Sequence, residues 1–120
     1  MPKAKIDVDA VRKIGLALPG VEASTAYAAF ALKFQGKLIA CVPTHKSAEA
    51  GSLMVRVDFD RRAELLEEAP QTYYLKDHYK NYPAVLVRLA EIRPDELRDL
   101  LRGACQFVST PAKRKSRLAR

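Results

Sequence analysis

The chain has 120 residues, of which 48% are hydrophobic and 29% charged, and its formal net charge is +7. This length predicts a single domain with a core large enough to fold without disulfides or a metal. No apolar run reaches the roughly 18 residues of a membrane span, and no signal-peptide segment follows the first lysines, so we expect a cytoplasmic protein outside the membrane.

The first predicted element is a helix that begins near Asp7 or Asp9, either of which is suited to cap it, and that stops at Pro19-Gly20. Apolar residues recur along it at spacings of three and four, which places them on one stripe facing a core. These residues are Val8, Val11, Ile14 and Leu18.

Three strands are predicted next. Residues 30–34 alternate cleanly, Gln35-Gly36 is a two-residue turn, and residues 37–42 return, so the two strands form a β-hairpin. The first of these strands turns Phe30, Leu32 and Phe34 to one face. A polar loop leads to a third strand over residues 53–58, whose inward residues are Leu53, Val55 and Val57.

A second helix is expected over residues 61–69, with Asp60 as its cap. Its inward residues are Ala63, Leu66 and Ala69. Residues 72–75 form a short fourth strand, and residues 84–90 form a fifth strand whose apolar composition suits the middle of a sheet. Pro94 fits the first position of a third helix. The apolar residues that follow it at the helical period are Leu97, Leu100, Leu101, Ala104 and Val108.

The resulting order, α-β-β-β-α-β-β-α, predicts an α+β fold of two layers. Short turns between the strands favour a mostly antiparallel five-stranded sheet with the helices on one face. The other face of the sheet is then left open to water or to a partner.

The C-terminal end carries most of the positive charge. Residues 111–120 contain five cations and no acid, and subtracting these five from +7 leaves +2 for residues 1–110. We therefore expect one domain over residues 1–110, followed by a disordered basic tail over residues 111–120. Such a tail either serves solubility or attracts polyanions without reading their sequence. The cations that would contact phosphates are Lys113, Arg114, Lys115 and Arg117.

Five segments, taken in their order and spacing, resemble the MmcQ/YjbR family of small bacterial domains. They are ALPGVE at 17–22, FALKFQGKL at 30–38, LMVRVD at 53–58, HYKNYP at 78–83 and PDEL at 94–97. The resemblance spans about residues 7–109. It implies a two-layer fold similar to that of secretion chaperones, and it implies DNA binding. It supplies no catalytic residues, and it does not extend to the basic tail.

Alternation along three strands turns one cation each toward the predicted open face. These cations are Lys33, Arg56 and Arg88, with Met54 and Leu86 among them. Lysine and arginine on such a face are able to contact phosphates and so position a nucleic acid. The alternative is a solvated face on which long basic side chains cover apolar neighbours. The order of the strands decides whether the three cations adjoin.

Four of the five tyrosines lie between residues 73 and 82, interleaved with cations. Aromatic rings beside cations suit stacking on unpaired bases, and they also suit a protein–protein hot spot. Tyr73 and Tyr74 point to opposite faces, so one of them belongs to the core. The predicted binding residues of this turn are Lys76, Tyr79, Lys80 and Tyr82.

Enzyme signatures are missing: the chain has no P-loop, dinucleotide fingerprint, zinc-protease or nucleophile-elbow motif. We expect Cys41 and Cys105 to be small buried residues of the core; neither a disulfide between them nor a reactive thiol is predicted. His45 and His78 have no ligands at metal-binding spacing, and we expect His78 to hydrogen-bond within its own turn. We therefore predict no catalytic residues, no metal and no cofactor.

Two functions follow as hypotheses. The first is a non-enzymatic domain that binds DNA or RNA through the open sheet face, the tyrosine-rich turn and the tail. The second is a protein-interaction module, chaperone-like or homodimeric, whose binding would be nearly independent of salt.

Overall fold

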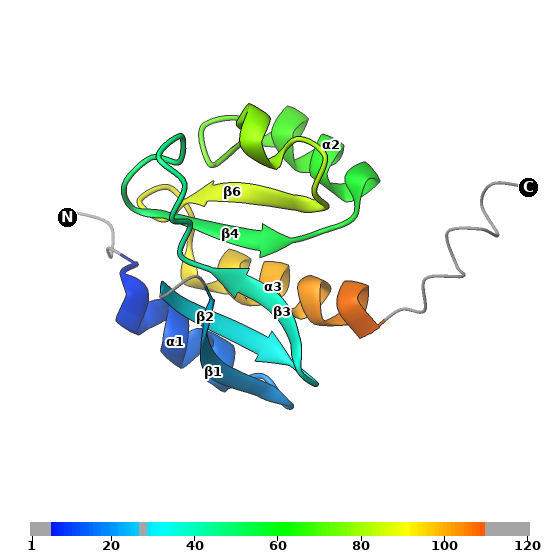
Figure 1. The fold of residues 1–120 in the computed structure, drawn as a ribbon. Helices are drawn as coiled ribbons and strands as arrows, with labels where there is room; N and C mark the ends of the chain where they lie inside the picture. Colours follow the sequence, from blue (N-terminus) through cyan, green and yellow to red (C-terminus); the bar gives the residue numbers. More distant parts are fainter. Residues whose placement is uncertain (1–5, 27–28, 110–120) are drawn as a thin grey trace, which may run out of the picture.

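The computed structural model of the protein describes residues 6–26 and 29–109, so the predicted basic tail lies outside the described residues. Figure 1 shows helices packed against one sheet. In chain order the elements are α1 (Val8–Leu16), β1 (Val21–Ala26), β2 (Ala29–Phe34), β3 (Lys37–Cys41), β4 (Ser52–Arg56), α2 (Phe59–Glu68), β5 (Tyr73–Tyr74), a single 3₁₀ turn η1 (Asp77–Tyr79), β6 (Ala84–Arg88) and α3 (Pro94–Ser109).

The six strands form one antiparallel sheet in the order β1-β2-β3-β4-β6-β5. The α+β class and the antiparallel sheet are therefore confirmed, and β6 lies inside the sheet as its apolar sequence predicts. One strand was not expected. Strand β1 pairs with β2 along its whole length, from Val21 opposite Phe34 to Ala26 opposite Ala29. Its Ser24 and Thr25 resemble a loop in sequence, but an edge strand with one solvated side tolerates them.

All three helices pack on one face of the sheet, as predicted, and we call this the helix face. A continuous apolar core joins Val11 of α1, Leu65 of α2 and Leu97 of α3 to the strands. The inward residues predicted for the third and fifth strands, Leu53, Val55, Val57, Val85, Val87 and Leu89, all lie in this core. The helix face therefore holds the main hydrophobic contribution to folding.

The start of α1 differs from the predicted stripe. Asp7 is the cap, since its carboxylate accepts a hydrogen bond from the Ala10 amide at 2.9 Å. Val8 is 41% exposed, and Ile6, the residue before the cap, is buried in the same core as Val11. An apolar residue before the cap packing near the fourth helical residue is a hydrophobic staple. Ile6, rather than Val8, therefore makes the first core contact of this segment.

Helix α2 begins two residues earlier than predicted. Asp58 rather than Asp60 is its cap, accepting a hydrogen bond from the Arg61 amide at 2.7 Å. Leu65 is its buried residue, whereas Ala63 is exposed. Either aspartate is chemically suited to cap the helix. Burying the larger Leu65 removes more apolar surface from water than burying an alanine would, and this favours the observed start.

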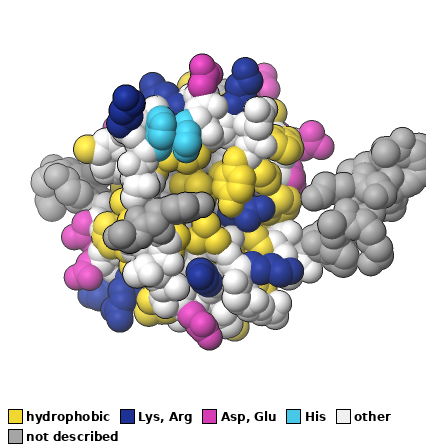
Figure 2. All heavy atoms as spheres, in the orientation of Figure 1, with side chains coloured by type: hydrophobic (Ala, Val, Ile, Leu, Met, Phe, Trp, Pro, Cys, Tyr) yellow, Lys and Arg dark blue, Asp and Glu magenta, His cyan; other side chains and the backbone are white. Residues whose placement is uncertain are grey.

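The sheet face opposite the helices, which we call the far face, is not open as predicted. A second buried cluster covers it, formed by Ala31, Cys41, Met54, Tyr74, Tyr79, Ala84 and Leu86. Residues of the 42–51 loop and of the segment around η1 pack against this cluster, among them Ala48 and Leu75. Figure 2 shows hydrophobic side chains across the middle of this side of the molecule. Strands β4 and β6 are therefore buried on both sides.

Candidate nucleic-acid interface

A bulge in β3 opens the sheet next to the end of β4. Leu32 lies opposite Ala40 and Lys33 opposite Leu38, so Ile39 is an extra residue on β3. Strand β3 then pairs with β4 at only two positions, Ala40 and Cys41. A bulge bends its strand, and in Figure 1 the two strands diverge toward the C-terminal end of β4. The last residue of β4, Arg56, lies at this opening.

Arg56 is held between two aromatic rings. Its guanidinium lies 4.8 Å from the centre of the Tyr82 ring and 5.3 Å from that of Phe107 on α3. Its Nε donates a hydrogen bond to the Pro83 carbonyl at 3.2 Å. Among the described residues, its two terminal nitrogens have no hydrogen-bond or ion-pair partner. Arg56 is thus fixed in place while its phosphate-binding donors stay available.

Of the two aromatic residues that contact Arg56, Tyr82 is the exposed one, at 37% relative exposure. A second arginine, Arg62 of α2, holds the backbone that carries it. The guanidinium of Arg62 donates hydrogen bonds to four carbonyls of residues 79–84, those of Tyr82 and Lys80 at 2.9 Å each among them. It also lies 4.7 Å over the ring of Phe59, which is 48% exposed. This role has no signature in the sequence, because Arg62 lies among other charged residues of a helix.

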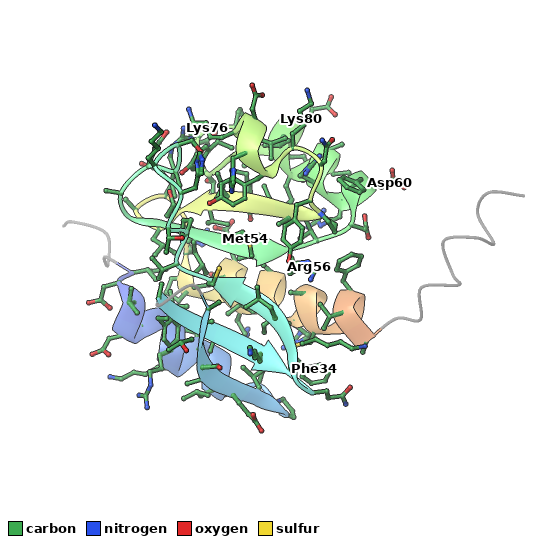
Figure 3. All side chains as sticks on the ribbon, in the orientation of Figure 1. Phe34, Met54, Arg56, Asp60, Lys76 and Lys80 are labelled. Carbon is green, nitrogen blue, oxygen red and sulfur yellow. The ribbon has the colours of Figure 1, made fainter. Side chains whose placement is uncertain are left out.

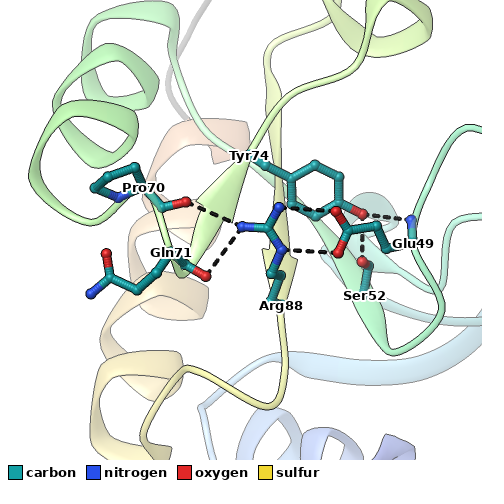
Figure 4. A network of polar contacts seen from close by, with 6 residues as sticks. All are labelled: Glu49, Ser52, Pro70, Gln71, Tyr74 and Arg88. Carbon is teal, nitrogen blue, oxygen red and sulfur yellow. Dashed lines mark hydrogen bonds and ion pairs between the residues drawn. The ribbon is translucent and has the colours of Figure 1, made fainter.

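Arg88 lies in a different setting from Arg56 (Figure 4). Both oxygens of the Glu49 carboxylate accept hydrogen bonds from it at 2.9 Å, and its Nη1 donates to the Pro70 and Gln71 carbonyls at 3.1 and 3.2 Å. The guanidinium covers the Tyr74 ring at 4.5 Å. Arg88 therefore ties the 42–51 loop and the α2–β5 connection to the sheet, and its donors are engaged within the fold.

The strand order does not gather the three predicted sheet cations. On the β4–β6 ladder Arg56 lies opposite Ala84 and Arg88 lies opposite Ser52. The two arginines are four residues apart along the strands, about 13 Å at the usual rise. Lys33 is half-buried on β2, two strands away from β4, with Glu22 opposite it on β1. All three side chains are half-buried, and Arg56 differs from Arg88 in that its terminal donors have no partner among the described residues.

The predicted turn residues separate into buried and exposed ones. Tyr79 is buried, at 8% exposure, in the far-face cluster, and burial raises the pKa of its phenol. Lys76 and Lys80 are exposed, and Figure 3 shows both on the segment around η1, with Arg56 at the end of β4. Of this turn, the lysines and Tyr82 are thus accessible to a ligand. Tyr73 and Tyr74 are both buried, one on each face of the sheet, where we expected one core residue.

The two histidines form a stack that closes the far face. Their rings lie 3.6 Å apart and nearly parallel, at 11°, and Tyr79 presents its ring edge-on to both. Figure 2 shows the pair side by side. His78 contacts the neighbouring loop in this way, beyond the turn in which we expected its hydrogen bond. Partial burial of His45 and the nearby charges of His78 and Lys46 lower its pKa.

Neither cysteine shows the features of a reactive thiol. Cys41 belongs to the far-face cluster and Cys105 to the helix-face core, and both are free and buried, as predicted. Burial raises the pKa of both thiols. Within residues 6–26 and 29–109, no three His, Cys, Asp or Glu side chains lie where they would hold a metal ion. No helix of the same residues is long and apolar enough to cross a membrane.

The described part of the chain is electrically neutral. All 14 Asp and Glu residues lie within it, whereas seven of the 21 lysines and arginines lie outside, at Lys3, Lys5 and in residues 111–120. The predicted tail cations, Lys113, Arg114, Lys115 and Arg117, are among these seven. The net charge of the described part therefore supplies no general attraction for a polyanion.

Comparisons with known proteins agree with this fold. A family model described as YjbR matches residues 16–106. Among solved structures, the crystal structure of Deinococcus radiodurans protein DR2400, with a domain described as DUF419, is similar at a TM-score of 0.69 and 24% identity. The match covers 97% of this chain and 91% of that one, and at this identity it shows the fold alone. No curated protein matches the chain.

Proposed function

The chain belongs to the YjbR family, and we propose that it is a non-enzymatic domain that binds single-stranded nucleic acid beside Arg56 and Tyr82. The observation that carries this proposal is the geometry of Arg56. Its guanidinium is fixed between Tyr82 and Phe107, and its terminal nitrogens have no partner among the described residues. A fixed guanidinium with free paired donors suits a phosphate, because little side-chain entropy is lost on binding.

The exposed ring of Tyr82 supplies the second contact. An unpaired base stacks on a tyrosine ring with about 1–3 kcal/mol, whatever its identity. Lys80 is exposed on the turn that carries Tyr82 and adds positive charge for the backbone of a bound strand, whereas Lys76 lies 5.8 Å over the Tyr74 ring, beside the Arg88–Glu49 pair. A duplex keeps its bases stacked inside, so we expect single strands to bind more tightly than duplexes of equal length. Both contacts, a phosphate and a stacked base, are offered equally by DNA and by RNA.

The five cations of residues 111–120 add long-range attraction. Because the described part is neutral, the tail supplies most of the electrostatic attraction and its salt dependence, while the Arg56 edge determines which form of nucleic acid is preferred. Five tail cations contribute a slope of log affinity against log salt of at most about −3.5 on a single strand.

A protein-interaction role is the second candidate. The neutrality of the described part and the exposed Phe59, at 48%, favour it. Tyrosine and arginine are common in protein–protein hot spots, and such an interface, including a homodimer, would also use Tyr82 and Arg56. This role predicts binding that hardly changes with salt and a mass that rises with concentration.

Fluorescence anisotropy of the full chain with labelled single-stranded DNA, RNA and duplex DNA at several salt concentrations tests the proposal. We expect Arg56→Gln to reduce the slope by about 0.7 and Tyr82→Leu to weaken binding by about 1–3 kcal/mol. Arg12→Gln removes an exposed arginine of α1 and serves as the matched control. If Arg56→Gln and Tyr82→Leu bind as the control does, the interface is not beside Arg56.

A further inference from the structure

A groove lies between α2 and α3 on the side of the molecule away from the far face. Its volume is about 310 Å³. The floor is apolar and includes Val57, Leu65, Leu100 and Phe107, with the ring of Tyr73. The rim is acidic and carries Asp58, Glu68, Glu96 and Asp99, against a single lining cation, Arg61. An apolar floor with a charged rim of one sign fits long side chains of the opposite charge.

The acidic rim keeps its negative charge. Arg61 is already paired with Glu64 at 3.0 Å, outside the groove lining. Asp99 has only an exposed contact with Arg102 at 3.6 Å, which is worth little in water. Glu68 has no hydrogen-bond or ion-pair partner among the described residues. Burial raises the pKa of the Tyr73 phenol; the charges of Glu96 and Glu68 add to this effect and that of Arg61 opposes it.

The matching positive charge of this chain is close to the groove in sequence. Helix α3 lines the groove from Glu96 to Phe107 and ends at Ser109. The eleven steps from Glu96 to Phe107 along the helix span about 16 Å. The eight residues that follow Ser109, up to Arg117, extend to about 27 Å, enough to turn back and follow the groove. Residues 113–117 contain four cations and no acid.

We propose that this groove is the docking site of the chain's own basic segment, residues 113–117. The aliphatic stems of its lysines and arginines would cover the apolar floor, and their charged ends would meet Glu68, Glu96 and Asp99. Gly103 lies on the groove lining, where a Cβ atom would meet nothing within 4 Å, so there is room for a second backbone beside α3.

Docking and polyanion binding then compete for the same cations. The segment would leave the groove when a nucleic acid neutralises it, and the groove would lower the affinity of the tail for any polyanion. The inference does not rest on the proposed function, because the groove and the Arg56 edge are different surfaces with different lining residues, except that Phe107 borders both.

Zero-length carbodiimide cross-linking of the full chain, read by mass spectrometry without any nucleic acid, tests the docking. The reagent joins a lysine amine to a carboxylate only where the two are in contact. We expect Lys113 and Lys115 to join to Glu68, Glu96 or Asp99 severalfold more often than to Glu67, the exposed neighbour of Glu68 on α2. The yield should not change on dilution, and Glu68→Gln should lower it while Glu67→Gln should not.

Cross-links spread evenly over Glu67 and Glu68, or none from the tail lysines, would overturn the docking. So would cross-links that disappear on dilution, because the groove would then take the segment of a second copy. A second measurement compares amide NMR spectra of the chain with those of a variant in which Lys113, Arg114, Lys115 and Arg117 are all glutamine. We expect shifts at Leu100 and Gly103; unchanged signals there contradict the proposal.

Discussion

Arg88 and Glu49 form a bidentate ion pair, in which Nε donates to Oε1 and Nη2 donates to Oε2 at 2.9 Å each (Figure 4). The pair joins β6 to the 42–51 loop across 39 residues of sequence. Around it, Tyr74 accepts a hydrogen bond from the Glu49 amide at 2.8 Å and shares one with Ser52 at 2.5 Å. The loop that covers the far face is therefore fastened by a network with a single guanidinium at its centre.

The first prediction concerns this network. Arg88→Gln removes the ion pair and two hydrogen bonds to carbonyls, and we expect it to lower the free energy of unfolding by about 1–3 kcal/mol. Glu49→Gln leaves the carbonyl contacts and should cost less, about 0.5–1 kcal/mol. Urea denaturation of both variants measures the difference. Arg98→Gln, at an exposed position of α3, is the control; equal midpoints for Arg88→Gln and this control would contradict the network's role.

The second prediction concerns pH. The pKa of His45 is lower in the folded chain than its ordinary value of 6.5, and the groups facing it, His78, Lys46 and the Tyr79 phenol, supply no negative charge at neutral pH. Below pH 6.5 the unfolded chain therefore takes up a proton before the folded chain does. Stability is complete above pH 6.5 and decreases as the pH falls toward the folded pKa.

Urea midpoints between pH 5 and 7.5 check this dependence. We expect His45→Gln to have a flatter profile than the natural chain, because it removes the group that binds the extra proton in the unfolded state. A titration of the His45 ring by NMR with a midpoint at or above 6.5 would show that the stack does not favour the neutral form.

The third prediction contrasts two helical glycines. In α3, a Cβ atom on Gly103 would meet nothing, so Gly103→Ala should raise stability by about 0.5–1 kcal/mol through helix propensity. In α1, a Cβ atom on Gly15 would lie 2.5 Å from Cδ1 of Leu32, which is fully buried and has little room to move. Gly15→Ala should therefore destabilise the fold by about 1–2 kcal/mol despite the better propensity. Thermal denaturation of both variants measures the change in melting temperature. A change in the same direction for both variants would contradict the prediction.

Periodicity in the sequence was enough for the three helices, the β2–β3 hairpin and the inward residues of β4 and β6. Each of these is a local pattern with a period of 3.6 or 2. The sequence indicated only indirectly that the 42–51 loop and the segment around η1 cover the far face. The nearly continuous apolar run of β6 is typical of a strand buried on both sides, and Met54 and Leu86 occupy its second side. We placed both residues on an open face because all three helices were expected on the other face of the sheet.

The candidate site could not be predicted in the same way. Arg56 and Tyr82 are 26 positions apart in sequence and come together because β4 pairs with β6, with Arg56 opposite Ala84, and because Arg62 holds the turn that carries Tyr82. The bulge at Ile39 opens the sheet on the other side of β4. A bulge has no periodic signature, and an arginine on a helix surface is usually solvated. Alternation did place Arg56 and Arg88 on one face, but their hydrogen-bond partners, which give them different roles, depend on tertiary structure.

The last prediction concerns Arg62 as the residue that positions Tyr82. Its four hydrogen bonds fix the backbone of residues 79–84, and its guanidinium also lies over the Phe59 ring, so its donors are engaged within the fold. We expect Arg62→Gln to lower the free energy of unfolding by about 1–3 kcal/mol and to speed hydrogen exchange in that turn.

The same variant separates positioning from direct contact. If the nucleic-acid proposal holds, Arg62→Gln weakens single-strand binding while leaving its salt slope unchanged, because no phosphate contact is lost. Arg56→Gln lowers the slope as well as the affinity. A reduced slope in Arg62→Gln would show that this arginine itself contacts phosphate, and the site would then extend along α2 toward Phe59.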